Sequence, residues 1–128
     1  MQKKLRNKTL TQDEIIEIAE EIAEETIENT TKGIYKFTKL LEDEELSKIV
    51  KIELLTALAD YEIVFESHNL IAILKKLSLG YDRDIVFFSA YALGIGNAEE
   101  AQFFLDELGK SEKTTLTNTA VRAIEKER

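Results

Sequence analysis

Proline is absent from all 128 residues of this chain, which removes the strongest breaker of α-helices. From Thr11 onward, apolar residues recur at intervals of three and four, the spacing that lines one face of a helix. Five glycines, together with scattered Ser, Asp and Asn residues, interrupt this pattern where helices can begin or end. The sequence therefore predicts an all-α fold.

We expect about seven helices joined by short turns. Their predicted extents are residues 11–30, 34–41, 44–60, 67–79, 82 to 94 or 96, 97–108, and 111 to the C-terminus. Short connections of this kind favour antiparallel neighbours. Residues 61–66 are rich in β-branched and aromatic side chains, but a lone strand has no partner here, so we interpret them as a helix end and a connection.

Local signals mark several of these boundaries. Thr11 and Glu14 have the spacing of a capping box, and the predicted apolar stripe of that helix includes Ile27. Gly33 is placed to end the first helix, and Asp43 to cap the third, whose stripe includes Ile49. Further boundary residues are Ser67, Gly80, Asp82 and Asn97.

Residues 1–10 are polar and basic with little periodicity, so we expect a short, flexible lead-in followed by a single domain over residues 11–128. The chain has no cysteine, which excludes disulfides and thiolate metal sites. No stretch approaches the roughly 18 consecutive apolar residues of a membrane helix, and none follows the basic N-terminal residues as in a secretory signal. We therefore expect a cytoplasmic protein that does not use a membrane.

The side chains offer no pattern typical of catalysis, metal binding or cofactor binding. His68 is the only histidine, and the adjacent Ser67 would not face it on a helix, so we expect a helix cap followed by a first-turn residue. Glu62 and Glu66 precede it at spacings unlike those of carboxylate–histidine metal sites. Phosphate-binding and dinucleotide-binding glycine motifs are missing. We predict a non-enzymatic protein without cofactors.

The formal net charge is −8, and residues 11–30 contain no lysine or arginine. Four carboxylates fall on one polar face of the first predicted helix, at Glu17, Glu21, Glu24 and Glu28. A hydrated helix face explains such a row; the alternative is a docking strip for a protein with a basic surface. The acidic balance disfavours nucleic acid as a partner, because duplex binding needs a basic face.

Apolar positions also repeat at longer range. Leu58, Leu93 and Ile124 each lie near the end of every second predicted helix, 35 and 31 residues apart, while Leu74 and Leu105 on the intervening helices are separated by 31 residues. Two helices in each interval of this length indicate a helical-hairpin repeat, in which neighbouring hairpins stack to complete the core.

The run of residues 90–108, Ala-Tyr-Ala-Leu-Gly-Ile-Gly-Asn-Ala-Glu-Glu-Ala-Gln-Phe-Phe-Leu-Asp-Glu-Leu, resembles a HEAT-like repeat of the PBS-lyase type. Its first helix ends in Ala-Leu-Gly, a tight turn follows, and the second helix carries Leu105 and Leu108. Residues 120–124 and 46–79 are similar, although the nearest match to the family's Asp-Val-Arg signature is Asp84-Ile-Val. The resemblance implies stacked antiparallel hairpins, an α-solenoid fragment that binds partners along its second helices. A non-repeat helical bundle is the alternative.

Phe103 lies opposite the apolar stripe of its predicted helix, on the side that would face a binding groove, and Asp106 and Glu107 follow it. In the preceding repeat, Lys75 and Lys76 occupy the positions that correspond to these two acidic residues. An exposed aromatic residue among charges is typical of interfaces. We therefore expect a protein-binding module. A small inhibitor or immunity-type protein that neutralises a basic toxin or nuclease is the alternative, and self-association through an open C-terminal repeat is a further expectation.

Overall fold

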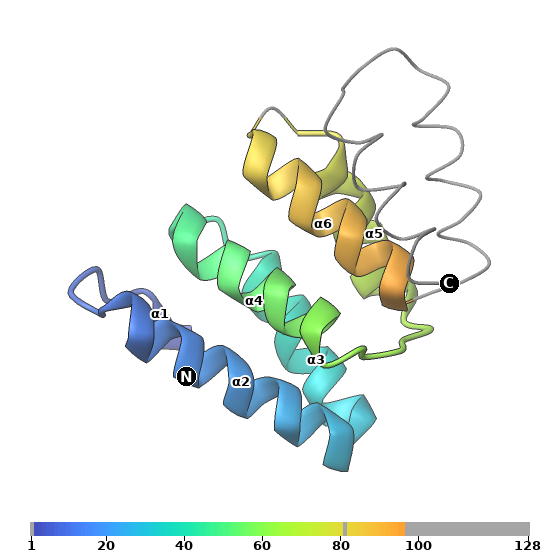
Figure 1. The fold of residues 1–128 in the computed structure, drawn as a ribbon, viewed down its shortest axis with the longest axis horizontal. Helices are drawn as coiled ribbons and strands as arrows, with labels where there is room; N and C mark the ends of the chain where they lie inside the picture. Colours follow the sequence, from blue (N-terminus) through green and yellow to red (C-terminus); the bar gives the residue numbers. More distant parts are fainter. Residues whose placement is uncertain (1, 81, 97–128) are drawn as a thin grey trace.

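The computed structural model of the chain describes residues 2–80 and 82–96 (Figure 1). Within these ranges it contains helices and no strand, which confirms the all-α prediction. The helices are α1 (Gln2–Leu5), α2 (Gln12–Glu28), α3 (Thr30–Leu41), α4 (Lys48–Asp60), α5 (His68–Ser78) and α6 (Arg83–Gly96). The last two predicted helices, over residues 97–108 and 111–128, lie outside the described residues.

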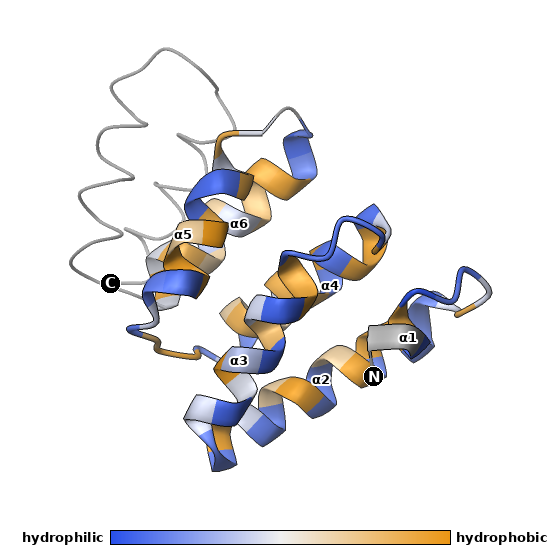
Figure 2. Cartoon of the chain, turned by 180° about the vertical axis from the view of Figure 1, so that it is seen from behind, coloured by the Kyte–Doolittle hydropathy of each residue, from blue (hydrophilic) through white to orange (hydrophobic). Residues whose placement is uncertain are grey.

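The five longer helices form two layers (Figure 1). Helix α4 lies between α2 and α6 in the first layer, and α3 packs against α5 in the second. Seen from the side of α3 and α5, the helices alternate hydrophobic and hydrophilic surface, as amphipathic helices do (Figure 2). The largest fully buried side chains come from both layers: Ile22, Phe37, Leu41, Leu54, Leu55, Leu58, Leu70, Ile71, Leu74 and Leu93. These residues make the core that holds the layers together.

Three of the predicted helix starts are confirmed by side-chain caps. Thr11 and Glu14 form the reciprocal capping box at the start of α2. The Ser67 hydroxyl accepts a hydrogen bond from the Leu70 amide at 3.3 Å, and Asp82 Oδ1 accepts one from the Ile85 amide at 3.1 Å. These contacts satisfy amides that the first turn of a helix leaves unpaired.

The prediction that Gly33 ends the first helix is wrong. Helix α2 ends at Glu28, and Asn29 serves as its C-cap and as the N-cap of α3. Gly33 lies buried inside α3, where a Cβ atom would collide with Thr26 of α2, including its backbone Cα. Glycine is needed at this position because the two helices approach so closely, not because the chain must turn.

The prediction that Asp43 caps the third helix is also wrong, since α4 begins at Lys48 after Ser47. Asp43 is buried instead, and its carboxylate accepts hydrogen bonds from Arg6 Nε at 2.8 Å and the Glu45 amide at 3.0 Å. This ion pair and the burial of Leu5 in the core connect the predicted lead-in to the rest of the fold.

Residues 63–67 form the expected connection between α4 and α5, and their side chains alternate in burial. Ile63 and Phe65 are buried, whereas Val64 is exposed. The Phe65 amide donates a hydrogen bond to the Gly96 carbonyl oxygen at 3.0 Å, and the Phe65 ring occupies the space that a Cβ on Gly96 would fill. The connection is therefore anchored on the end of α6.

Candidate binding groove

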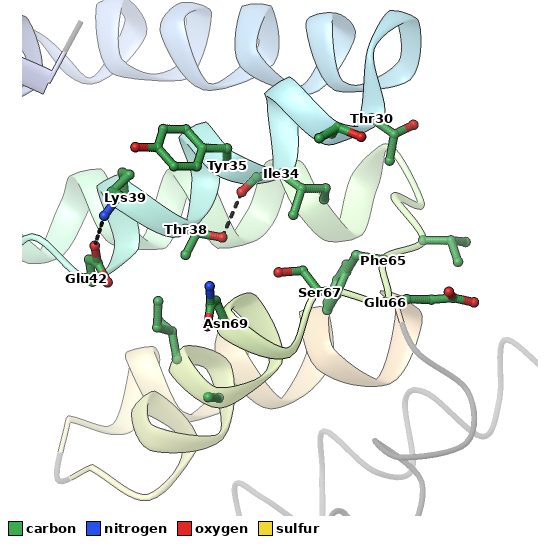
Figure 3. Close-up of a pocket in the computed structure, with 14 residues that line it drawn as sticks. Thr30, Ile34, Tyr35, Thr38, Lys39, Glu42, Phe65, Glu66, Ser67 and Asn69 are labelled. Atoms are coloured by element: carbon green, nitrogen blue, oxygen red, sulfur yellow. Dashed lines mark hydrogen bonds and ion pairs between the residues drawn. The ribbon is translucent and has the colours of Figure 1, made fainter.

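An open groove of about 860 Å³ lies between α3, α5 and the connection that precedes α5 (Figure 3). Helix α3 supplies Thr30, Thr31, Ile34, Tyr35, Thr38 and Lys39, and Glu42 follows at its end. The connection supplies Val64, Phe65, Glu66 and Ser67, and α5 supplies Asn69, Ala72 and Ile73.

The groove has an apolar base and an exposed apolar rim. Ile34 and Phe65 are buried beneath it, while Tyr35 and Val64 at its edges are 63% and 69% exposed. Single exposed apolar residues are common on protein surfaces. Tyr35 and Val64, however, lie beside the same concave surface, where their hydration is unfavourable. A combination of this kind is typical of interaction surfaces.

Several polar groups of the groove are engaged within the chain. The Thr38 hydroxyl donates to the Ile34 carbonyl oxygen at 2.8 Å, and the Ser67 hydroxyl caps α5. Lys39 pairs with Glu42 at 3.2 Å and lies over the Tyr35 ring, and the Glu42 carboxylate raises the pKa of Lys39. A molecule in the groove would therefore meet mainly apolar surface and a few charges at its ends.

Ser67 and His68 occupy the cap and the exposed first turn of α5, as the sequence predicts. Across residues 2–80 and 82–96, no three metal-ligating side chains gather, and every buried side-chain nitrogen or oxygen has a hydrogen-bond partner. None of the helices described is both long enough and apolar enough to cross a bilayer.

The four predicted acidic residues of α2 form one exposed row. Glu17, Glu21, Glu24 and Glu28 follow one another at intervals of four, three and four, so they share a helix face. No ion pair involving them occurs within the described part of the chain. This acidic row faces away from the core that the rest of α2 helps to form.

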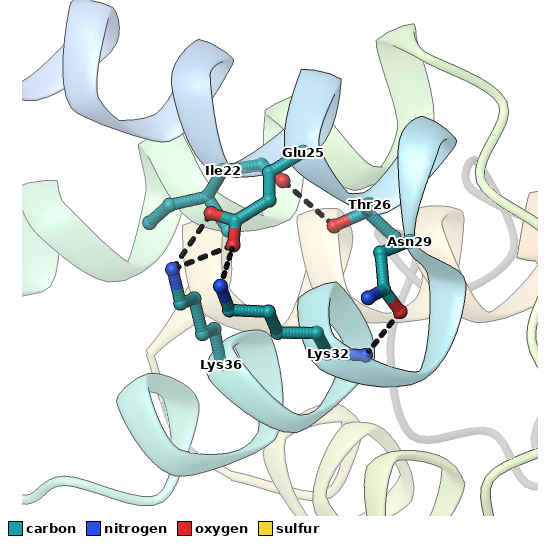
Figure 4. A network of polar contacts seen from close by, with 6 residues as sticks. All are labelled: Ile22, Glu25, Thr26, Asn29, Lys32 and Lys36. Carbon is teal, nitrogen blue, oxygen red and sulfur yellow. Dashed lines mark hydrogen bonds and ion pairs between the residues drawn. The ribbon is translucent and has the colours of Figure 1, made fainter.

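Glu25 follows Glu24 of the acidic row but has a different role. It faces two lysines of α3 (Figure 4). Its carboxylate accepts hydrogen bonds from Lys36 Nζ at 2.7 and 2.8 Å, and Lys32 Nζ lies 3.3 Å away. Lys36 and Lys32 together hold the pKa of this carboxyl below its usual value. The cluster links α2 to α3 and engages two of the lysines of α3.

The other predicted partner-binding residues are placed as follows. Lys76 is exposed and Lys75 half-buried on α5, the helix that lines the groove, whereas Phe103, Asp106 and Glu107 lie outside the described residues. Helix α2 packs against α3 and α4, and α5 against α3 and α6, so the structure does not bring the acidic row and the two lysines together. They belong to separate surfaces.

Tyr35 and Val64 were missed as candidate site residues, although the sequence carries a signal for each. Tyr35 falls off the apolar stripe formed by Ile34 and Phe37, so an exposed position follows from helical spacing. Val64 stands between the buried Ile63 and Phe65 in an extended segment, where side chains alternate in direction. That both border one groove depends on the packing of α3 beside α5.

Fold and groove together define a class: a two-layered, all-helical protein with an open, largely apolar groove on its second layer. Comparisons of the chain with protein-family models, with curated proteins and with solved structures find no match.

Proposed function

We propose that this chain is a non-enzymatic protein-binding module whose partner occupies the groove between α3 and α5. The observation that carries the proposal is the open apolar groove of about 860 Å³ with exposed Tyr35 and Val64 at its rim. Burial of apolar surface is the main favourable term in protein association, and aromatic residues contribute disproportionately to it.

The same proposal includes a HEAT-like stacking of hairpins. The first-layer helices α2, α4 and α6 begin at residues 12, 48 and 83, so successive starts lie 36 and 35 residues apart. Leu58 and Leu93, which the repeat alignment places at equivalent positions, are both fully buried. In this arrangement α3 and α5 are the second helices of their hairpins, and the groove lies on the layer that the HEAT-like resemblance assigns to partners.

A matched pair of variants tests the groove. Tyr35 and Ile27 are exposed to nearly the same extent, 63% and 62%, but only Tyr35 lines the groove. Substitutions at exposed positions change stability by no more than about 0.5 kcal/mol, so Tyr35→Ser and Ile27→Ser should both remain folded. Proteins captured from a source lysate should be lost with Tyr35→Ser and kept with Ile27→Ser. Equal capture by both variants would contradict the proposal.

The acidic row of α2 supports a second candidate, a small inhibitor or immunity-type protein that covers a basic toxin or nuclease. The specific observation is that Glu17, Glu21, Glu24 and Glu28 are all exposed on one face. Charge–charge recognition weakens as salt screens it, whereas apolar burial does not. Replacement of the four glutamates by glutamine should abolish salt-sensitive capture if this candidate is correct, and leave capture unchanged if the groove is the site.

A further inference from the structure

We infer that the groove receives an α-helix of about three turns, which lies antiparallel to α3 and α5, with an acidic residue near its N-terminus and a basic residue near its C-terminus. This inference rests on the proposed function and names the occupant of the same groove. Three properties of the groove lead to it: its length, the backbone of its walls and the opposite charges at its two ends.

The length of the groove matches a short helix. Its α3 wall runs from Thr30 to Glu42, which at about 1.5 Å per residue spans roughly 18 Å, or about three helical turns. Both walls are helices whose amides and carbonyls bond within the helix, so along most of the groove there is no sheet edge for an extended peptide to join. The extended connection with Phe65 and Glu66 borders only one end (Figure 3). Affinity must come from side chains, as when an amphipathic helix lies in a groove.

Helices α3 and α5 run in the same direction along the groove. Thr30 and Ser67, at the starts of α3 and α5, lie at one end with Glu66, while Lys39 and Glu42, from the end of α3, lie at the other (Figure 3). The two helix dipoles therefore point the same way, and an antiparallel third helix would oppose both of them.

The two ends of the groove carry opposite uncompensated charges. Glu66 lines the groove and is exposed at the end where the helices begin. Lys76 does not line the groove, but it is exposed one turn beyond the lining residues Ala72 and Ile73, towards the other end. Neither Glu66 nor Lys76 takes part in an ion pair with any residue that the structure describes, whereas Lys39 is compensated by Glu42. A complementary occupant has a basic residue beside Glu66 and an acidic residue beside Lys76.

Only one orientation pairs the occupant with the charges of opposite sign at the groove ends and also suits the charge preference of the occupant's own helix ends. An α-helix is stabilised by acidic residues in its first turn and by basic residues in its last turn. When its acidic N-terminal turn lies beside Lys76 and its basic C-terminal turn beside Glu66, the helix runs antiparallel to α3 and α5. The reverse orientation would place like charges together unless the occupant carried charges that weaken its own helix.

A displayed peptide library tests this orientation. The probe is a set of helix-forming peptides of about 14 residues with apolar residues at i, i+4 and i+7, in which the first and last turns vary among Glu, Lys and Gln. We expect clones with Glu first and Lys last to be enriched about tenfold over the reverse arrangement. The double variant Glu66→Lys/Lys76→Glu, which keeps the net charge, should invert this preference. Binding should be lost with Ala72→Arg and with Tyr35→Ser. A parallel library with a central proline should give no clone that depends on these two residues.

The outcomes separate the two levels of the proposal. Clones that depend on Ala72 and Tyr35 but show no charge preference, or keep it in the swapped variant, would overturn the inferred orientation and leave the groove as a binding site. If clones from the proline library also lose binding to the Ala72→Arg and Tyr35→Ser variants, the inference that the occupant is a helix would be wrong. If no clone from either library depends on Ala72 or Tyr35, the groove is not a peptide site, and the proposed function fails together with this inference.

Discussion

Replacement of Gly33 by alanine provides a sharp test of the packing between α2 and α3. At an exposed position inside a helix, this change would stabilise the protein by about 1 kcal/mol, because alanine is a much better helix former than glycine. At Gly33, however, the new methyl group would overlap Thr26, and the overlap includes the backbone Cα of α2 as well as the side chain. A backbone cannot rotate away, so α3 would have to move.

Overpacking costs about 1–3 kcal/mol, and the overlap with backbone places Gly33→Ala in the upper part of this range, about 2–3 kcal/mol. After subtraction of the gain of about 1 kcal/mol in helix propensity, we expect a net destabilisation of about 1–2 kcal/mol. Chemical unfolding in urea, followed by circular dichroism, measures this difference directly. For a chain of this length it corresponds to a fall in Tm of roughly 3–5 °C per kcal/mol.

Gly80→Ala is the matched control. Gly80 follows α5 without a positive φ angle, and a Cβ there would meet only the Leu77 carbonyl oxygen at an ordinary contact distance of 3.4 Å. We expect this variant to be as stable as the wild type or slightly more stable. If Gly33→Ala proved as stable as Gly80→Ala, the close approach of α2 and α3 would be refuted.

Three further changes probe helix faces, charge and caps. Ile22→Ala should cost about 2–4 kcal/mol in urea unfolding because Ile22 is fully buried, whereas Ile27→Ala should stay within about 0.5 kcal/mol; similar losses would refute the assigned face of α2. Lys36 and Lys32 lower the pKa of Glu25, so the stability from this carboxylate is present above the ordinary glutamate pKa and lost as the pH falls through the lowered value. The stability difference between wild type and Glu25→Gln should therefore be larger at about pH 6 than at about pH 3, and a difference that grows on acidification would contradict the ion pair. Thr11→Ala should cost about 1 kcal/mol through loss of the capping box, in contrast to a neutral Thr9→Ala.

Three helix starts predicted from local patterns, at Thr11, Ser67 and Asp82, were confirmed. The capping box of Thr11 and Glu14 and the caps at Ser67 and Asp82 depend on side chains that reach amides of the same first turn. Such contacts need only residues that are neighbours in the chain, so the sequence can predict them where no distant segment competes.

The errors arose where a distant segment decides the role of a residue. Gly33 has the signature of a helix end, but the proximity of α2 gives it a packing role. Asp43 has the signature of a cap, but Arg6, which is 37 positions away, pairs with it. In α2 the buried stripe continues through Thr26, whose hydroxyl donates to the Ile22 carbonyl oxygen at 2.7 Å, and Ile27 is left exposed. In each case local preference competes with tertiary contacts that spacing does not reveal.

The groove was only partly predictable for the same reason. The resemblance directed attention to the second helices and to Lys75 and Lys76, and α5 does line the groove. The wall opposite is formed by α3, whose Tyr35 was not considered, because its exposure acquires meaning only when α3 lies beside α5.

The net charge of −8 is also a poor guide to the partner, because charge is segregated between helices. Helix α2 contains aspartate and glutamate but no lysine or arginine. Helices α3 and α5 contain lysine but no arginine, aspartate or glutamate. Glu25 engages Lys32 and Lys36 of α3, and Glu42 engages Lys39, so the three lysines of α3 are neutralised within the fold. The acidic row of α2 would attract a basic partner, whereas the occupant proposed for the groove would meet Glu66 at one end and Lys76 near the other. Selection by the groove must then depend on apolar fit and on the order of charges along the occupant rather than on its total charge.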